Sequence, residues 1–240
     1  PESRELNRKI FEHMYYAALV ASCDLAQKYS PYQDFSSSPA AEGILQFDLW
    51  GVPHGDEKWI KLKENIKIHG LMNSLLIGLM PTATTSQILG YNECFEPFTT
   101  NIYVRRTLAG EFVVMNRYLV NDLKSLGLWS KDMKDDIIRN NGSIQSIQII
   151  PKNIRDIYKT VWEISPRVII DMARDRGVYV CQSQSMNLFV EDPTNAKMSS
   201  IHMYAWKQGL KTGMYYLRTR PKAKAQQVTI EPPTCTMCSA

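Results

Sequence analysis

The sequence predicts an α/β fold, because segments with helical periodicity alternate with short apolar or β-branched runs that are typical of strands. Apolar residues recur at helical spacing over residues 5–28, whereas residues 74–79, 183–190 and 215–219 are strand-like. Hydrophobic residues make up 44% of the 240 positions, which is enough for one sizeable core. The net charge of +4 is too small to indicate binding to nucleic acid or to an anionic membrane.

The first helix is expected from Glu5 to Lys28, ending before Ser30-Pro31, and a loop is expected at Ser36–Pro39. A second helix is expected at Trp59–His69, with Gly70 as its C-terminal cap. A third helix is predicted to begin near Thr84–Ser86. Four more are predicted at Leu119–Leu126, Lys131–Arg139, Ile154–Arg176 with a break at Pro166, and Ser199–Thr212.

Three segments are expected to be strands. Ser74–Leu79 is apolar, Ser183–Val190 alternates as a half-buried strand does, and Tyr215–Thr219 is rich in residues that favour the pleat. No apolar run approaches the roughly 20 residues of a membrane-spanning helix. The start of the chain has no secretion signal, so neither a membrane nor an export function is expected.

The most informative run is Met80–Gly90, which follows an apolar strand and leads into a helix. Its small and hydroxylated residues, at Thr82, Ala83, Thr84 and Thr85, would expose free backbone N–H groups at the positive end of a helix dipole. Such a junction can hold phosphate. The same residue types also form ordinary helix caps, and residue types alone leave both interpretations open.

Two further pairs are candidates for chemistry. Cys235 and Cys238 form a C-x-x-C motif within a segment, from Lys222 onward, that is expected to be flexible. A single pair is not a zinc site, and it is either incidental or suited to thiol exchange. Tyr215 and Tyr216 are adjacent aromatic residues on a predicted strand, where at least one would be expected in the core.

Several motifs in the same order resemble the large, catalytic subunit of ribonucleoside-diphosphate reductases of the aerobic eukaryotic or viral type. The resemblance rests on Met80–Gly90, Gly209–Pro221 and Cys235–Cys238, and on further similar segments at Tyr15–Ala26, Asn141–Gln145, Lys159–Ser165 and Gln182–Asn187. It covers nearly the whole chain but only the C-terminal part of the family's longer subunit. It implies the C-terminal portion of a ten-stranded α/β barrel with surrounding helices over residues 1–221, and a flexible redox tail over residues 222–240.

The resemblance also implies an activity, namely reduction of ribonucleoside diphosphates to deoxyribonucleoside diphosphates by radical chemistry, which supplies DNA precursors in the cytoplasm. Thr82, Ala83, Thr84 and Thr85 would hold the substrate diphosphate. Tyr215 and Tyr216 would pass on the oxidising equivalent, and Cys235 and Cys238 would carry electrons from thioredoxin or glutaredoxin.

The partners that the resemblance implies are a second large subunit in a homodimer and a small subunit that bears the metal-radical cofactor. ATP and dNTP effectors of this allosteric enzyme would bind mainly upstream of this segment. No metal or cofactor is assigned to residues of this segment. The family's radical cysteine, with its Asn and Glu partners, is expected to lie before Pro1.

Two cysteines need separate interpretations. Asn92-x-Cys94-x-Glu96 has the spacing of the family's radical-cysteine motif, but it follows the phosphate loop almost directly. It matches instead a family segment in which cysteine is optional, so we do not take Cys94 as the radical site. Cys181 stands where the family usually has Asp, and it is interpreted as a buried small hydrophobic residue.

Two alternatives remain. The chain could be a non-catalytic, truncated relative that still docks the small subunit through the segment Ile154–Arg176. An apolar strip would then be expected at Ile157, Val161, Ile164, Ile169 and Met172, flanked by Lys159 and Arg167. The other alternative is a generic phosphate-binding α/β protein, which would not account for the paired tyrosines and the terminal thiols together.

Overall fold

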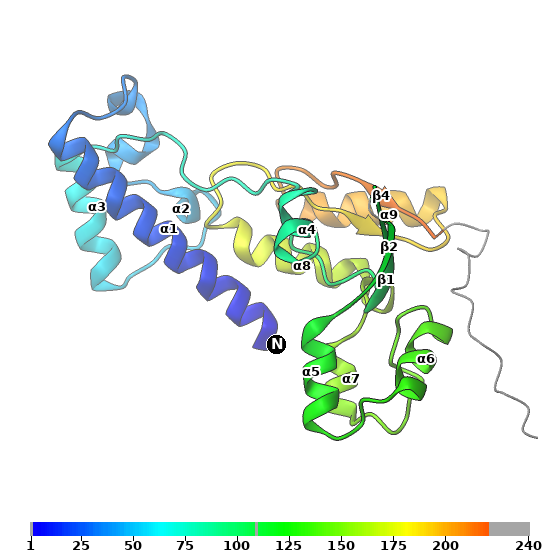
Figure 1. The fold of residues 1–240 in the computed structure, drawn as a ribbon. Helices are drawn as coiled ribbons and strands as arrows, with labels where there is room; N and C mark the ends of the chain where they lie inside the picture. The colour runs from blue at the N-terminus through cyan, green and yellow to red at the C-terminus, as the bar shows by residue number, and fades with distance from the viewer. Residues whose placement is uncertain (1, 109, 221–240) are drawn as a thin grey trace, which may run out of the picture. The chain divides into compact units, whose positions relative to one another are not determined.

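The computed structural model describes residues 2–108 and 110–220, and the predicted redox tail therefore lies outside the described residues (Figure 1). The chain separates into two compact units. Among the described residues, the first unit comprises 2–95, 166–188 and 193–217, and the second comprises 96–108, 110–165, 189–192 and 218–220. Each unit contains segments that are distant in sequence.

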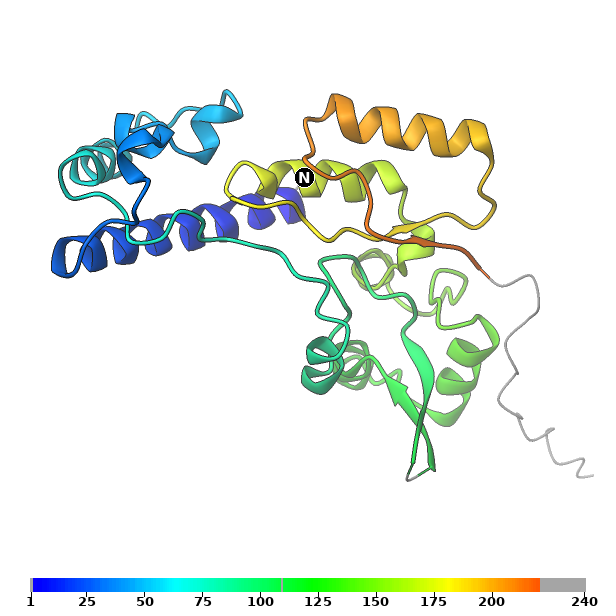
Figure 2. The same cartoon turned by 90° about the horizontal axis from the view of Figure 1, so that it is seen from above.

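The first unit is organised around the helix α1 (Glu2–Lys28), which confirms the first predicted helix. Phe11, Tyr15 and Leu19 follow one another at four-residue spacing and are buried on one face of α1. This face contributes to a core shared with α3 (Glu57–His69) and the buried residues 178–180. Figure 2 shows α8 (Pro166–Gly177) lying between α1 and α9 (Asn195–Lys207), and α8 packs against both helices.

Gly70 ends α3 as predicted, and its φ of 81° favours glycine. A Cβ at this position would lie 2.5 Å from Cγ of Pro31, so the site excludes a side chain for steric reasons as well. The loop predicted at Ser36–Pro39 is instead part of two 3₁₀ turns. The short helical elements of this unit are η1 (Phe35–Ser37), η2 (Pro39–Glu42), α2 (Gln46–Leu49) and α4 (Thr85–Leu89).

The second unit has its own core, built from helices and one hairpin. Its helices are α5 (Arg117–Ser125), α6 (Lys131–Arg139), α7 (Lys152–Ile157) and the 3₁₀ turn η3 (Val161–Glu163). The antiparallel hairpin of β1 (Ile102–Thr107) and β2 (Gly110–Met115) was not predicted. The buried residues are Leu119, Leu123, Met133, Ile137, Ile144, Ile147 and Ile150.

The helix predicted at Ile154–Arg176 with a break at Pro166 is confirmed in its second half, where α8 begins at Pro166, but its first half is wrong, because α7 ends at Ile157 and η3 follows it. The backbone N–H of Thr160 donates to Glu163 at 2.7 Å, which starts a new turn, and Pro166 then begins α8. The apolar strip predicted there is also wrong. Val161 and Ile169 are buried in the cores of different units, and of the other members only Ile157 is largely exposed.

The predicted strands are much shorter than expected. β3 (Leu188–Phe189) pairs with β4 (Leu217–Arg218), and the segment 74–79 contributes only an isolated parallel bridge between Leu79 and Gln184. The predicted burial alternation is wrong, because residues 186–190 are all buried. Continuous burial indicates a segment covered on both faces, as in parallel sheets. The backbone partners of β3 and β4 also advance in the same direction.

Candidate functional site

The loop that precedes α4 has the local geometry of an anion-binding site. α4 begins at Thr85 with Thr84 as its N-cap, which confirms the predicted helix start. Thr82, Ala83, Thr84 and Thr85 are all exposed. The N–H groups of Ala83, Thr84 and Thr85 donate no hydrogen bond to any other described residue, whereas that of Ser86 donates to the Thr82 carbonyl at 2.9 Å. Three donors are therefore available to a ligand at a helix start.

Cys94 holds the beginning of this loop. Its backbone N–H donates to the carbonyl of Pro81 at 3.1 Å and to Oγ1 of Thr82 at 3.2 Å. Thr82 and Cys94 have φ values of 52° and 55°, in the left-handed region that residues with a side chain seldom adopt. Because such backbone is costly, these contacts are what keeps Thr82 in place.

Tyr215 and Tyr216 do not divide between core and surface as expected for adjacent strand residues. Their ring centroids are 4.2 Å apart at an interplanar angle of 59°, and the residues are 45% and 49% exposed. β4 begins only at Leu217, so the strict alternation of a strand does not apply to them. The pKa of Tyr215 is raised, first by a hydrogen bond with Tyr216 and less by nearby groups that include Cys94 and Glu93.

One buried segment connects the loop with the tyrosines. The carbonyl of Met186 accepts a hydrogen bond from the Tyr215 N–H at 2.7 Å, and the N–H of Leu188 donates to the Tyr216 carbonyl at 2.9 Å. Between them, Nδ2 of the buried Asn187 donates to Sγ of Cys94 at 3.4 Å. The structure thus brings together, within the first unit, two of the predicted sites that lie about 130 residues apart in sequence.

The two cysteines that needed separate interpretations have structural roles. Sγ of Cys94 donates to the Pro81 carbonyl at 3.5 Å, in addition to its contact with Asn187. Cys181 is half-buried rather than buried, and its sulfur accepts a hydrogen bond from the Leu76 N–H at 3.5 Å. It packs against the core of the first unit. Its small, weakly polar sulfur suits a position between core and backbone.

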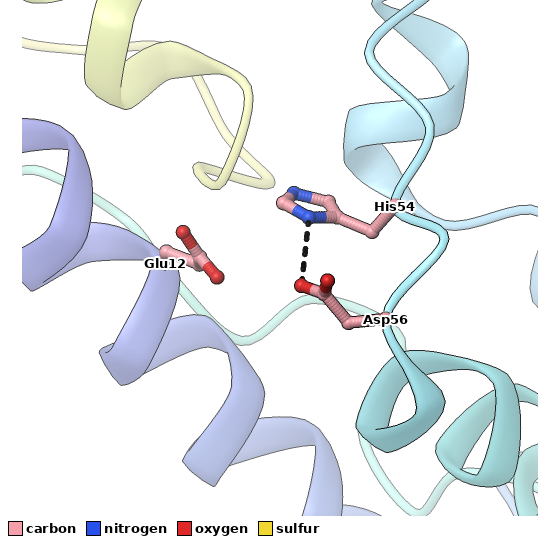
Figure 3. A group of neighbouring side chains, drawn as sticks. All are labelled: Glu12, His54 and Asp56. Carbon is pink, nitrogen blue, oxygen red and sulfur yellow. Dashed lines mark ion pairs between the residues drawn. The ribbon is translucent and has the colours of Figure 1, made fainter.

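Among the described residues, Glu12, His54 and Asp56 form a group that could hold a metal ion (Figure 3). Their possible ligand atoms lie within 4.8 Å of one another, but most are already engaged. Glu12 accepts hydrogen bonds from Arg8 at 2.9 Å and Lys58 at 3.1 Å, and Nε2 of His54 lies 2.9 Å from the Tyr179 hydroxyl.

The electrostatics of Glu12 favour a structural role for this group. Burial acts to raise its pKa, but the contacts with Lys58 and Arg8 outweigh burial and leave the pKa below its ordinary value. A divalent cation would have to displace these two cations. We therefore interpret the group as structural, with Glu12 of α1 bound by Arg8 and by Lys58 of α3. Sequence reasoning missed it, since no spacing connects Glu12 with His54.

A loop that presents free backbone N–H groups at a helix start and a pair of adjacent, tilted tyrosine rings lie on one α/β scaffold. Residues 1–216 match the family model for the ribonucleotide reductase barrel domain, and the chain belongs to this family. The match accords with the barrel portion that the resemblance implies.

Relatives and a solved structure agree with this assignment. The chain is 59% identical over 231 residues to the ribonucleoside-diphosphate reductase large chain of Cryptosporidium parvum, covering 95% of this chain and 29% of that protein. It is 54% identical over 231 residues to large chain 2 of Saccharomyces cerevisiae, covering 96% and 27%. The alpha subunit of the class Id ribonucleotide reductase of Actinobacillus ureae has a similar fold, with a TM-score of 0.67 and 26% identity over 91% of this chain and 34% of that one.

The chain therefore spans less than a third of the length of these two relatives. Over residues 2–108 and 110–220, no helix has both the length and the apolarity needed to cross a membrane. Cys235 and Cys238, the predicted redox pair, lie outside the described residues.

Proposed function

We propose that this chain is the C-terminal part of a ribonucleoside-diphosphate reductase large subunit and supplies the diphosphate loop and the radical-carrying tyrosines. The main support for the proposal is that the loop and the tyrosine pair both contact the buried segment 186–188. The tyrosines bind its backbone, and Cys94, which holds the loop, accepts a hydrogen bond from Asn187. Family membership and the relatives' names support the same reaction.

In this proposal, the exposed N–H groups of Ala83, Thr84 and Thr85 donate to the substrate's phosphate oxygens, and the hydroxyls of Thr82, Thr84 and Thr85 add further donors. Because the loop is already formed, binding requires little reorganisation. Each N–H···phosphate bond is charge-assisted and therefore among the stronger hydrogen bonds.

Tyr215 and Tyr216 carry the oxidising equivalent from the small subunit towards the substrate. A phenol can lose an electron together with its proton, which avoids a charged intermediate, provided that a hydrogen-bonding partner is near. The ring separation of 4.2 Å places the two phenols side by side, and Tyr216 is the main cause of the raised pKa of Tyr215, which supports this requirement. The thiyl-forming cysteine is assigned to no residue of this chain, because Cys94 is engaged in holding the loop.

Cys235 and Cys238 would return electrons from thioredoxin or glutaredoxin to the active site, which suits a reducing compartment such as the cytoplasm. The partners in this proposal are a second large subunit and a small subunit that holds the metal-radical cofactor. ATP and dNTP effectors would bind elsewhere in the full-length subunit.

The experiment is a turnover assay of the full-length large subunit that contains this segment, mixed with its small subunit. Formation of deoxycytidine diphosphate from cytidine diphosphate, with thioredoxin and its reductase as electron source, is the expected result. Omitting the small subunit is the control and should abolish turnover. A correctly assembled complex without turnover would exclude the catalytic proposal.

A non-catalytic docking role is the second candidate, and exposed apolar side chains on two adjacent helices favour it. Val168 on α8 and Met203 and Trp206 on α9 are exposed, with Trp206 at 70%. Large apolar residues are the usual anchors for a partner helix or peptide. A complex that binds the small subunit but forms no deoxynucleotide would support this role alone.

A further inference from the structure

Arg176 is a buried arginine that the proposed mechanism does not use. It lies in the last turn of α8 and is only 2% exposed. Burying a guanidinium is unfavourable unless its donors and its charge are satisfied. The contacts of this side chain therefore indicate which parts of the fold Arg176 holds in place.

The first contact of Arg176 leads to the N-terminal side of the diphosphate loop. Its Nε donates to Oε1 of Gln184 at 2.7 Å, while Nε2 of Gln184 donates to the Ala173 carbonyl at 2.8 Å. The side-chain amide of Gln184 is thus held on both of its atoms. Its backbone forms the parallel bridge with Leu79, the last buried residue before the loop.

The second contact of Arg176 leads to the start of the same loop by another route, through residues that follow α4 in sequence. The guanidinium lies over the ring of Phe95, 5.1 Å from its centroid, and Phe11 meets this ring edge-on at 5.5 Å. A planar guanidinium over an aromatic face is a favourable cation–π arrangement. Phe95 directly follows Cys94, whose N–H holds Pro81 and Thr82.

These contacts form a closed ring. It runs from Arg176 through Gln184 to Leu79, across the start of the loop to Cys94, and through Phe95 back to Arg176. We propose that Arg176 is a positioning residue that fixes the start of the diphosphate loop by two routes, through Gln184 to Leu79 and through Phe95 and Cys94 to Pro81 and Thr82, and so keeps the exposed N–H groups aligned for substrate phosphate. This inference rests on the proposed function.

The test uses the full-length large subunit with its small subunit, and it compares two variants. Arg176→Lys retains the positive charge but loses Nε and the planar face. Phe95→Leu changes a partly exposed side chain, so it should fold normally, and it removes the cation–π contact together with the edge-on contact to Phe11. We expect the KM for cytidine diphosphate to rise roughly tenfold in Arg176→Lys and about threefold in Phe95→Leu, with kcat at saturation nearly unchanged.

A nucleoside without phosphate separates loop positioning from general damage. The inhibition constant of cytidine should be the same in both variants as in the wild type, because cytidine does not use the loop. Arg155→Lys is the matched control, since Arg155 is likewise an arginine with internal hydrogen bonds, donated to the backbone carbonyls of Gln145 and Ile150, but in the second unit. It should leave the KM unchanged.

The possible outcomes are distinct. An unchanged KM in Arg176→Lys, or a parallel loss of kcat in Arg176→Lys and Arg155→Lys, would overturn the positioning role while leaving the proposed function intact. A wild-type enzyme that forms no deoxynucleotide would overturn the proposed function and this inference with it. A rise in KM that is confined to the phosphorylated ligand would support both.

Discussion

Arg4 and Asp175 form a two-point ion pair that joins the start of α1 to the end of α8. Nε and Nη2 of Arg4 lie 2.5 and 2.8 Å from the two carboxylate oxygens, and Nη1 lies 3.5 Å from Asp171. The arginine is partly exposed, so solvent screening weakens the pair, whereas its bidentate geometry strengthens it.

We expect Arg4→Met to lower the free energy of unfolding by about 1 kcal/mol, since it leaves Asp175 and Asp171 without this cation. Urea unfolding monitored by circular dichroism measures the change. Lys9→Met is the matched control, because Lys9 makes a single exposed contact with Glu5 at 3.5 Å. An equal effect of both substitutions would mean that the bidentate pair contributes nothing specific.

Thr84→Ala should separate substrate binding from stability. The Thr84 side chain makes no cap hydrogen bond, so its loss should change the free energy of unfolding by less than about 0.5 kcal/mol. Its hydroxyl is one of the proposed phosphate donors, so the KM for a ribonucleoside diphosphate should rise several-fold. Steady-state kinetics and thermal unfolding of the full-length subunit measure the two effects.

Thr194→Ala provides the opposite pattern as a control. Thr194 caps α9 by accepting a hydrogen bond from the Lys197 N–H at 3.3 Å. Its removal should cost about 1 kcal/mol of stability and leave the KM unchanged. If Thr84→Ala behaved like Thr194→Ala, the loop would be an ordinary helix cap.

Tyr215→Phe and Tyr216→Phe keep the ring packing but delete the phenolic proton. We expect each to abolish deoxynucleotide formation whether the reductant is thioredoxin or a small dithiol, because radical transfer precedes reduction. The fold should be unaffected, since both residues are about half exposed and the substitution keeps the ring. Turnover near the wild-type rate in either variant would mean that the tyrosine pair has no redox role.

The double change Cys235→Ser and Cys238→Ser should produce a split between reductants. Turnover supported by thioredoxin should collapse, whereas a small dithiol that reaches the active site directly should sustain it. The comparison is made in one assay of the full-length enzyme with each reductant in turn. Equal losses with both reductants would show that the pair is not a shuttle.

Asp156 provides a prediction about pH. Hydrogen bonds from Lys152 and Lys159 lower the pKa of this exposed carboxyl from 3.8 to about 2. A lowered folded-state pKa stabilises the folded form fully above about pH 3.8, and this contribution is lost as the pH falls through about 2. NMR titration should find the low pKa in the wild type and a higher one in Lys152→Met. An unchanged pKa in that variant would exclude the Lys152 contact as its cause.

Local signals in the sequence were sufficient for the helices with clear periodicity or caps. α1, α3, α5 and α6 lie close to their predicted positions, and Gly70 and the Thr84–Ser86 helix start were found from residue type. α9 begins four residues before its predicted start at Ser199, because Thr194 caps it there. Caps and periodicity depend on residues that are close in sequence, so a single sequence is enough to recognise them.

Features that depend on contacts distant in sequence were not predictable in this way. The continuous burial of residues 186–190 arises from layers on both faces, and the helix break near Thr160 depends on a side chain that competes with the helix. The resemblance pointed to the loop and the tyrosines but not to the hydrogen bond between Asn187 and Cys94 that joins them. The contact between Arg176 and Phe95 likewise bridges 81 positions, for which the sequence contains no local signal.

The interleaved order of the two units has a consequence for synthesis on the ribosome. The apolar face of α1 needs residues 166–180 for its cover, and all of residues 96–165 must be made in between. At about 5–20 residues per second, this interval lasts on the order of 10 s. During that time residues 166–180 cannot yet cover the core residues of α1, among them Phe11 and Leu19. We expect a nascent chain at this stage to bind chaperones, and pausing of translation within residues 96–165 should reduce the yield of native protein.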